Sequence, residues 1–382
     1  MVEPCPMIEL SGAPFERGRD YGRKAQARIA KGIAHYSGQL KTMSIGPTEI
    51  KGLVNDYLPV IEGFDASFVV EMRGIAEGAN VSFEEIALLN ARTEILKMAS
   101  RPDLRARLAA SLAKDEPDGC TGVVALPGAT RDGKLIHAQN WDWKAECAET
   151  AVVLRIRRDD GPDVLTFVEA GGLARSGMNS VGIAVTANYL ESDRDYSQVG
   201  VPLALIRRKI LDSEHVALAM RSVYASPKSA SNNMIVSHKE GVAIDFECAP
   251  DETFQVHPER GLIVHANHWQ SPVALSKLKD TGIANTPDSL YRDIRVRDLL
   301  TPHIGSITTD SVKTALFDDF ATPWSVCRPP RPSLGNNLSA TVAMIVMEPA
   351  SFAMDVAMLP ALNRNFQRFR LDGTAPLRAA VA

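Results

Sequence analysis

The pattern of the sequence changes once, at residues 118–120, and this change limits the folds that the chain can adopt. Before it, residues 14–113 carry apolar side chains at helical intervals, and Ser82 and Glu85 have the spacing of a capping box. After it, short apolar runs alternate with turn residues, which is typical of antiparallel hairpins. A single cysteine, Cys120, therefore stands between a helical segment and a segment rich in strands.

The second segment is expected to contain both strands and helices. Apolar runs bounded by turn residues predict hairpins over 121–143, 150–171, 232–249 and 252–268, a strand over 181–190 and two strands over 337–359. Helical periodicity predicts helices within 201–224, 288–301 and 309–320. This order of elements favours an α+β fold in which helices cover the outer faces of antiparallel sheets.

The composition is that of an ordinary globular protein, and it argues against several kinds of partner. The 382 residues carry a formal net charge of −4, so we expect no general attraction to nucleic acid or to anionic membranes. No apolar run reaches the roughly 20 residues of a membrane span. Residues 1–10 lack the basic and apolar regions of a secretory signal. These features, together with five scattered cysteines that suggest a reducing setting, predict a cytoplasmic protein.

The sequence contains no pattern for a metal or an organic cofactor. The cysteines have no Cys-x-x-Cys pairing, so neither a zinc site nor a disulfide framework is expected. His265 and His268 could suggest a metal site, but on a strand this spacing would place the two side chains on opposite faces. We therefore predict that the protein uses no cofactor and no metal.

Cys120 is a candidate nucleophile, and the residue before it suggests how the thiol could be activated. The signature of papain-like proteases is absent, and no particular histidine stands out as a base. If the Gly119–Cys120 bond is cut, Cys120 gains an α-amine whose reference pKa of about 8 suits a base for its own thiol. The thiol could make this cut itself, since glycine has no side chain to block attack. The alternative is a buried core cysteine beside a loop glycine.

Short motifs along nearly the whole chain resemble one enzyme family. The motifs "DGCTG" at 118–122 and "QNWDW" at 139–143 resemble the maturation site and the following strand of isopenicillin N acyltransferases (acyl-CoA:6-aminopenicillanic acid acyltransferases), which are autoproteolytic cysteine N-terminal-nucleophile hydrolases. Further matches follow in order: "PFERGRDYG", "MRGIAEGANVSFEEIALLNARTE", "EAGGLARSGMNSVGIAV", "VHANH" and "WSVCR". The resemblance implies a four-layer αββα sandwich of the N-terminal-nucleophile hydrolase type, with an N-terminal helical pro-segment.

The resemblance also implies four catalytic residues. Cys120 would be the nucleophile, and its new α-amine would be the base. Asp142 in "NWDW" would orient and polarise that amine, and Asn267 in "HANH" would donate a hydrogen bond to the oxyanion. Arg328 in "WSVCR" would lie near the nucleophile, where it would lower the pKa of the thiol or hold Asp142 in place. Taken singly, each residue also has an ordinary structural explanation, such as a turn, a strand end or a surface charge.

Two serines are candidates for maturation or for support of the site. Ser231 in "SASNN" aligns with a serine that looks important for maturation in relatives, and Ser325 in "WSVCR" is a weaker candidate. Hydroxyl groups on loops most often satisfy backbone groups, so a purely structural role stays open for both serines.

These observations predict a division of the chain at its Gly-Cys bond. Residues 1–119 would form a helical pro-segment that becomes the small chain, and residues 120–382 would form the catalytic large chain. The small fragment is expected to remain bound as a partner, because the apolar faces of its helices need to be covered. The hairpin turn at 127–134 and the region 269–290 depart from the family pattern, so the substrate need not be a penicillin precursor.

The predicted activity is hydrolysis of a linear amide C–N bond through a thioester acyl-enzyme, with a small-molecule amide or thioester as substrate. Two alternatives stay open. An acyltransferase would pass the acyl group from acyl-coenzyme A or an amide to an amine, and the same catalytic residues would serve that reaction. A chain that is never processed would be a non-catalytic binding protein. The sequence also leaves further oligomerisation open.

Overall fold

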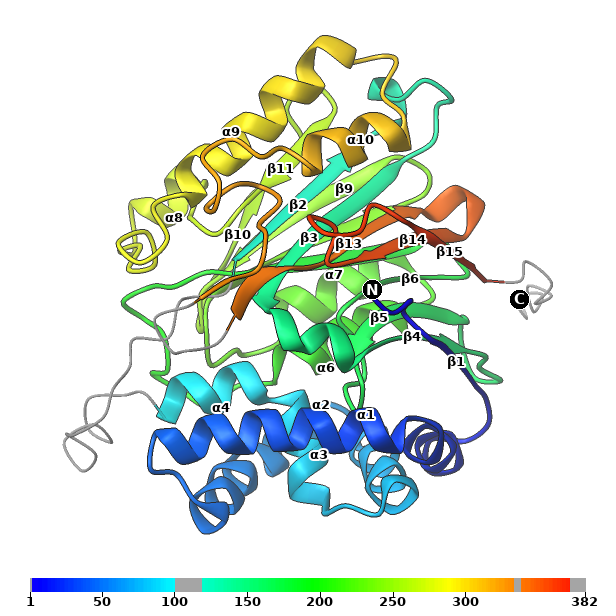
Figure 1. The fold of residues 1–382 in the computed structure, drawn as a ribbon, viewed down its shortest axis with the longest axis vertical. Coiled ribbons are helices and arrows are strands. Elements are labelled where there is room, and N and C mark those ends of the chain that lie inside the picture. Colours follow the sequence, from blue (N-terminus) through cyan, green and yellow to red (C-terminus); the bar gives the residue numbers. More distant parts are fainter. Residues whose placement is uncertain (1, 100–118, 333–337, 372–382) are drawn as a thin grey trace.

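A computed structural model describes residues 2–99, 119–332 and 338–371 of the chain (Figure 1). Two β-sheets face each other at the centre of the molecule, and helices cover both outer sides. The α+β, four-layer αββα arrangement implied by the sequence is therefore confirmed. The buried apolar side chains form one large cluster and several smaller ones, which lie between and beside the sheets.

Each sheet combines strands that are distant in the sequence. The eight-stranded sheet has the order β1-β4-β5-β6-β7-β8-β9-β10, with bounds β1 (Met7–Leu10), β4 (Ala151–Ile156), β5 (Val164–Glu169), β6 (Ser176–Asn179), β7 (Ile183–Tyr189), β8 (Asn232–His238), β9 (Val242–Cys248) and β10 (Thr253–Val256). The seven-stranded sheet has the order β11-β2-β3-β13-β14-β15, with β12 paired to β13. Its bounds are β2 (Gly119–Ala125), β3 (Ile136–Lys144), β11 (Leu262–His265), β12 (Arg331–Pro332), β13 (Leu338–Glu348), β14 (Ala353–Met358) and β15 (Gln367–Arg370).

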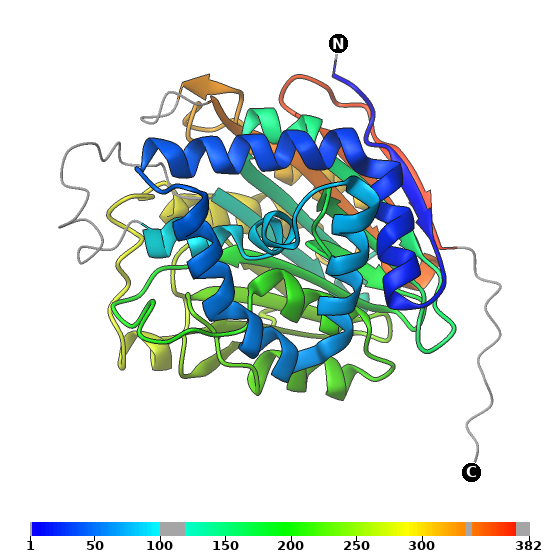
Figure 2. The ribbon, with the colours of Figure 1, turned by 90° about the horizontal axis from the view of Figure 1, so that it is seen from below.

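Helices form the two outer layers. They are α1 (Pro14–Thr42), α2 (Pro47–Ala79), α3 (Phe83–Asn90), α4 (Arg92–Ala99), α6 (Leu203–Leu211), α7 (Val216–Tyr224), α8 (Pro272–Leu275), α9 (Ser289–Leu300) and α10 (Thr309–Leu316). Helices α9 and α10 pack on the seven-stranded sheet, and α6 and α7 pack on the eight-stranded sheet. Figure 2 shows α1 and α2 spread across the lower side of the molecule. Within the described ranges, no helix has the length and apolar character needed to cross a membrane.

The N-terminal segment is anchored to the rest of the chain in two ways. Strand β1 pairs in parallel with β4, with Met7 opposite Val153. In α2, the buried carboxylate of Glu71 accepts hydrogen bonds from Arg17 of α1 (2.5 Å) and from Arg208 of α6 (3.1 Å). The segment is therefore part of the same fold in the uncut chain. Its predicted separation into a small chain by cleavage stays a prediction.

Glycines that pack two helices together account for the motifs "PFERGRDYG" and "MRGIAEGAN" in the N-terminal segment. Helix α1 carries Gly18 and Gly22, and α2 carries Gly74 and Gly78, at the place where the two helices cross. A Cβ added at Gly78 would lie 2.0 Å from the carbonyl oxygen of Arg19. The two backbones therefore touch directly, which requires residues without side chains.

The structure corrects one prediction about strand pairing. Residues 252–268 do not form a hairpin, because β10 pairs with β9 in one sheet and β11 pairs with β2 in the other. A run of alternating apolar residues identifies a strand but does not determine its neighbour. The structure also adds the short strands β1, β6, β12 and β15, which the sequence patterns did not indicate. The charged stretch from residue 101 to 119, which could be helix or linker, lies outside the described residues except for Gly119.

Candidate active site

Cys120 is the second residue of β2, and it is buried with 1% of its surface exposed. In the ladder between β2 and β3, Cys120 lies opposite Trp141, and Gly119 lies opposite Asp142. The backbone N–H of Cys120 donates a hydrogen bond to Oδ1 of Asn267 (2.7 Å). The fold thus brings Cys120, Asp142 and Asn267 together around the Gly-Cys bond, and Arg328 joins them through Asp142.

The side chain of Asn267 is held by three hydrogen bonds in the uncut chain. Its Oδ1 accepts from the Cys120 N–H and from Nη2 of Arg292 (2.8 Å), and its Nδ2 donates to the carbonyl oxygen of Tyr189 (2.9 Å). The amide group therefore presents its oxygen to Cys120, because a buried backbone N–H needs an acceptor. The predicted role of Asn267 as a donor to an oxyanion stays a prediction for the cut chain.

Arg292 is a site residue that the sequence analysis did not identify. Its Nη1 donates to the carbonyl oxygen of Cys120 (2.7 Å) and to the Thr121 hydroxyl (2.9 Å), and its Nε donates to Asp288 (2.8 Å). Burial and the positive charge of Arg328 lower the pKa of Arg292, although Asp288 opposes the change. The signal in the sequence was the spacing of Asp288 and Arg292, which puts both side chains on one helix face.

Asp142 and Arg328 form a buried ion pair beside β2. Arg328 Nε lies 3.3 Å from Asp142 Oδ2, and Arg328 Nη2 donates to Asp288. The Thr341 hydroxyl donates to Asp142 Oδ1 (2.6 Å). Burial alone would lower the pKa of Arg328, but the carboxylates of Asp142 and Asp288 raise it above its ordinary value. Arg328 therefore stays charged and holds two carboxylates in place. The family resemblance implied two possible roles for Arg328, and its contact with Asp142 fits the second, which is to hold Asp142 in place.

Gly119 occupies a position where a side chain does not fit. A Cβ added there would lie 2.7 Å from Asp142 Oδ2 and 2.8 Å from Arg328 Nη1. These distances are shorter than van der Waals contact, so the ion pair and a larger residue exclude each other. The backbone at the predicted cut site therefore lies directly against two charged groups.

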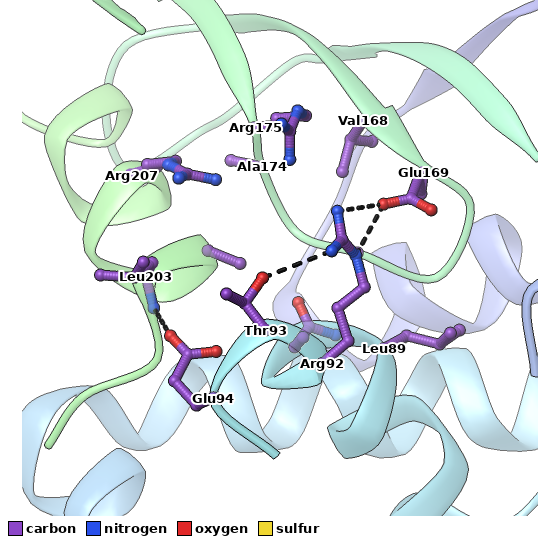
Figure 3. Close-up of a pocket in the computed structure, with 13 residues that line it drawn as sticks. Leu89, Arg92, Thr93, Glu94, Val168, Glu169, Ala174, Arg175, Leu203 and Arg207 are labelled. Atoms are coloured by element: carbon purple, nitrogen blue, oxygen red, sulfur yellow. Dashed lines mark hydrogen bonds and ion pairs between the residues drawn. The ribbon is translucent and has the colours of Figure 1, made fainter. Parts of the chain in front are cut away.

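The thiol of Cys120 faces another arginine that the sequence analysis did not identify. Arg175 lies between β5 and β6, and its Nη2 is 3.9 Å from the Cys120 sulfur. Its guanidinium group also lies over the ring of Trp141, 4.1 Å from the ring centroid. Figure 3 shows Arg175 in the wall of a pocket that it shares with Arg207. A cation this close to sulfur favours the thiolate form.

The two candidate serines are engaged in local hydrogen bonds. The Ser231 hydroxyl bonds to the carboxylate of Asp195 and to the Ser192 hydroxyl (2.9 Å). The Ser325 hydroxyl donates to the carbonyl oxygen of Cys327 (2.7 Å). These contacts fit the structural alternative for both serines, and a role in maturation stays a prediction.

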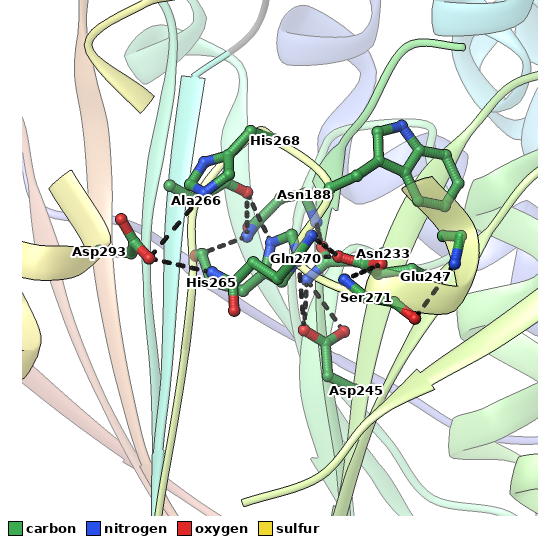
Figure 4. Close-up of polar contacts among 12 residues, drawn as sticks. Asn188, Asn233, Asp245, Glu247, His265, Ala266, His268, Gln270, Ser271 and Asp293 are labelled. Atoms are coloured by element: carbon green, nitrogen blue, oxygen red, sulfur yellow. Dashed lines mark hydrogen bonds and ion pairs between the residues drawn. The ribbon is translucent and has the colours of Figure 1, made fainter. Parts of the chain in front are cut away.

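A buried polar network holds the loop that carries Asn267 (Figure 4). Nε2 of His265 lies 2.7 Å from Oε1 of Glu247. The same carboxylate accepts hydrogen bonds from the backbone N–H groups of Gln270 (2.6 Å) and Ser271 (3.0 Å). Glu247 therefore fixes the chain on both sides of Asn267.

The strand pattern predicted that His265 and His268 lie on opposite faces, and this prediction was wrong. Strand β11 ends at His265, and the chain then turns so that the two rings stack with their centroids 6.2 Å apart. Burial alone would lower the pKa of His265, but the carboxylates of Asp245 and Glu247 raise it to about 9. In the parts of the chain that the structure describes, no group of three or more His, Cys, Asp or Glu side chains is arranged to hold a metal ion.

The chain is similar to known proteins over most of its length. The family model for acyl-coenzyme A:6-aminopenicillanic acid acyl-transferase matches residues 129–358. The 40 kDa form of acyl-coenzyme A:6-aminopenicillanic-acid-acyltransferase from Emericella nidulans is 28% identical over 324 residues, which are 84% of this chain and 84% of that protein. An uncharacterized protein from Archaeoglobus fulgidus is 23% identical over 343 residues, which are 80% of this chain and 56% of that protein.

Two solved structures are also similar, with lower sequence identity. A mutant form of conjugated bile acid hydrolase from Clostridium perfringens has a TM-score of 0.47 and 14% identity, and the match covers 66% of this chain and 92% of that one. Penicillin V acylase from Agrobacterium tumefaciens has a TM-score of 0.44 and 17% identity, and the match covers 66% of this chain and 86% of that one.

Proposed function

This chain belongs to the acyl-coenzyme A:6-aminopenicillanic acid acyl-transferase family, and from this premise we propose that it is a self-cleaving cysteine enzyme that hydrolyses a linear amide C–N bond. The observation that carries the proposal is the setting of Cys120. Its backbone N–H is bound by Asn267, its carbonyl oxygen is bound by Arg292, and the residue before it packs against Asp142. Every buried backbone group needs a partner, but at Cys120 the partners are the side chains of Asn267 and Arg292 rather than the backbone of a neighbouring strand.

The first proposed reaction is self-cleavage. The thiol of Cys120 attacks the carbonyl carbon of Gly119, the C–N bond breaks, and the nitrogen takes a proton and leaves as the α-amine of Cys120. The thioester between Gly119 and the Cys120 sulfur then reacts with water, which gives a carboxylate on Gly119 and a free thiol. Asp142 and Arg328 contact the position of Gly119, so they are placed to stabilise the charges that develop during the cut.

The mature enzyme would use the same sulfur on its substrate. The neutral α-amine of Cys120 takes the proton of its own thiol, and the thiolate attacks the acyl carbon of an amide. The ammonium group returns a proton to the leaving nitrogen, and a thioester remains on Cys120. Water then hydrolyses the thioester and releases the acid. Asp142 would stabilise the ammonium form during these proton transfers.

Cleavage would also change what Asn267 can do. In the uncut chain its oxygen accepts from the N–H of Cys120, and its nitrogen is bound to the carbonyl of Tyr189. A free amine can accept a hydrogen bond as well as donate one, so the amide is no longer required to present its oxygen. Asn267 can then donate to the oxyanion, with Arg175 as a cation on the thiol side.

The helical fragment is proposed to remain part of the cut enzyme. The Tyr36 hydroxyl and the Arg92 guanidinium, both from the N-terminal segment, bind the buried carboxylate of Glu169, each at 2.6 Å. Loss of the fragment would leave Glu169 without these two partners, and an unpaired buried charge costs several kcal/mol. The pairing of β1 with β4 would be lost as well.

We place the enzyme in the cytoplasm as part of the same proposal. All five cysteines are free thiols in the structure. Free thiols throughout a chain suit a reducing compartment, and they also suit an enzyme whose nucleophile must stay reduced.

Acyl transfer is the second candidate, because the family description and the name of the Emericella protein both state it. The two reactions share the thioester on Cys120 and differ in whether water or an amine attacks it. We favour hydrolysis because the sequence lacks a recognisable coenzyme A signature. If the chain is never cut, the remaining candidate is a non-catalytic binding protein.

Intact mass and N-terminal sequencing of the purified protein test the proposal. Wild type should give one fragment that ends at Gly119 and one that begins at Cys120, whereas Cys120→Ala should stay a single chain. Cys248→Ala is the matched control, since Cys248 is equally buried but lies in β9, and this variant should be cut. The cut enzyme should then hydrolyse N-acyl amides.

Three other outcomes would redirect the proposal. Turnover of acyl-coenzyme A with an amine, without hydrolysis of any amide, would favour the acyltransferase. An uncut wild-type chain without activity would favour the binding protein. Cleavage of Cys120→Ala at the same bond would exclude Cys120 as the nucleophile of maturation.

A further inference from the structure

A small cavity of about 40 Å³ is lined by Arg175, the arginine that contacts the Cys120 sulfur, and Figure 3 shows the residues around this cavity. Charged and polar side chains from both parts of the chain line it, among them Thr93, Glu94, Glu169, Arg175 and Arg207. The cavity has room for a few water molecules or one small polar group, but not for a long acyl chain. It borders the reaction centre, because Nη2 of Arg175 is 3.9 Å from the Cys120 sulfur.

Arg207 is a buried cation in this cavity. It lies in α6 with 8% of its surface exposed, and its Nε has no hydrogen-bond partner within the described ranges. Among the described residues, neither Arg207 nor Arg175 forms an ion pair with a carboxylate. Burial and the positive charge of Arg175 lower the pKa of Arg207 to about 9. Two buried like charges repel each other, and an anion placed between them would offset that repulsion.

The carboxylates that face the cavity are already engaged. Glu169 binds Arg92 and the Tyr36 hydroxyl, each at 2.6 Å. Glu94 accepts a hydrogen bond from the backbone N–H of Leu203 (2.7 Å), and burial raises the pKa of Glu94. Three arginines thus face two glutamates around the cavity, and the excess charge is positive.

We propose that this cavity binds a carboxylate group of the substrate, held by Arg207 and Arg175 while the scissile carbonyl lies at Cys120. The inference rests on the proposed amide hydrolysis and names its substrate class, which is linear amides with a carboxylate close to the C–N bond. A guanidinium group pairs with a carboxylate through two parallel hydrogen bonds. A neutral substrate would leave Arg207 buried without an anion, so the site discriminates against it.

The carboxylate can belong to either product of the hydrolysis. In an N-acyl amino acid it lies on the leaving amine, and in the monoamide of a dicarboxylic acid it lies on the acyl group. Two matched pairs separate these sources. Hexanoyl-glycine is compared with N-methylhexanamide for the amine side, and succinic acid monoamide is compared with butanamide for the acyl side.

The test is the ratio of kcat/KM for each acid to that of its neutral partner. In wild type, one acid should exceed its neutral partner by at least about tenfold, because charge-assisted hydrogen bonds are stronger than neutral ones. Arg207→Gln should lower this ratio by roughly 10- to 100-fold. Arg207→Lys should restore part of it. Glu94→Gln should raise the ratio, because it removes a negative charge from the same cavity.

Opposite shifts in the Arg207 and Glu94 variants would support the inference, since a general loss of packing would not move the ratio in both directions. Equal kcat/KM for acids and neutral amides, in wild-type enzyme that is cut and active, would overturn the inference and leave the proposed hydrolysis intact.

If no amide is turned over, calorimetric titration of the uncut Cys120→Ala protein with succinic acid monoamide and butanamide decides the question. No preference for the acid there, or a preference that Arg207→Gln does not reduce, would overturn the inference.

Discussion

Gly119 and Asp142 lie opposite each other in the β2–β3 ladder, and the carboxylate of Asp142 fills the space that a side chain at position 119 would take. Arg328 closes the same space from a second direction. The position of Asp142 therefore has two consequences. It requires glycine before the proposed nucleophile, and it places an anion at the proposed cut site.

Gly119→Ala should fold less stably and should stop or strongly slow self-cleavage. Its added methyl group would lie 2.7 Å from Asp142 and 2.8 Å from Arg328, so the ion pair would have to move, at a cost of about 1–3 kcal/mol. Gly128→Ala is the matched control, because a Cβ at Gly128 has nothing within 4 Å. The time course of fragment formation on denaturing gels measures the effect. Cleavage of Gly119→Ala at the wild-type rate would show that this contact plays no part in maturation.

Asp142→Asn should slow self-cleavage by about 10²–10⁴-fold, the usual range for loss of a group that assists proton transfer. Asparagine can still accept a hydrogen bond from Thr341, but it removes the negative charge 3.3 Å from Arg328. Thr341→Val makes the complementary change, because it removes the hydrogen bond and keeps the charge, and it should slow cleavage by about tenfold. Melting temperatures of both variants separate loss of charge from loss of fold. Equal slowing in the two variants would contradict an electrostatic role for Asp142.

The sequence could predict the part of the site that lies within one hairpin. Cys120 and Asp142 stand on two strands whose apolar runs and turn residues are local signals, whereas the roles of Asp142, Asn267 and Arg328 followed from the family resemblance. Arg292 could not be predicted, because it reaches the Cys120 carbonyl from a helix 172 residues further along the chain. The spacing of Asp288 and Arg292 indicates that the two side chains share one helix face, but nothing in the pattern of this helix indicates that Arg292 contacts Cys120.

The fold, like the site, could be predicted where it depends on local sequence signals and not where it depends on contacts between distant segments. Helices α1 to α3 have apolar periodicity, and α3 begins at the capping box of Ser82 and Glu85, so their positions follow from short stretches of sequence. The pairing of β10 and β11 depends instead on which sheet edges are open, since Leu262 of β11 lies opposite Ala125 of β2. That choice is made between distant segments, and it is the reason that the hairpin over 252–268 was predicted wrongly.

The buried pair of His265 and Glu247 predicts a stability that depends on pH. The pKa of His265 rises from its ordinary value of 6.5 to about 9 in the folded protein. A group whose pKa is raised in the folded state stabilises the fold fully at pH values below its pKa in the unfolded state. This contribution is lost as the pH rises through its pKa in the folded state. The free energy of unfolding should therefore fall by on the order of 2–3 kcal/mol between pH 6.5 and pH 9.

Urea unfolding of wild type and of Glu247→Gln at these two pH values measures the contribution of the pair. The fall should be smaller in the variant, because the neutral amide no longer favours the charged form of His265. Asp245 does not obscure the comparison, because burial raises the pKa of Asp245 only to about 6, below this pH range. Identical falls in the two proteins would mean that the pair does not control the pH dependence.

Two glycines of α2 should respond to the same substitution with opposite signs. Gly78→Ala would place a methyl group 2.0 Å from the carbonyl oxygen of Arg19, so α1 and α2 would have to separate, and stability should fall by roughly 1–3 kcal/mol. Gly52→Ala would meet nothing within 4 Å, and alanine favours the helix, so stability should rise by about 0.5–1 kcal/mol. Thermal unfolding of uncut Cys120→Ala protein carrying each substitution measures the difference without interference from cleavage.

The same pair of variants tests whether the crossing of α1 and α2 helps to retain the helical fragment after cleavage. In the cut enzyme, fragment release is measured by gel filtration at increasing urea concentration. Gly78→Ala should release its fragment at a lower urea concentration than wild type, because a loosened crossing weakens the surface that packs against the large chain. Gly52→Ala should release it at the wild-type concentration or higher. Equal release in all three proteins would mean that the crossing does not contribute, and that other contacts hold the fragment, such as those of Tyr36 and Arg92 with Glu169 and the pairing of β1 with β4.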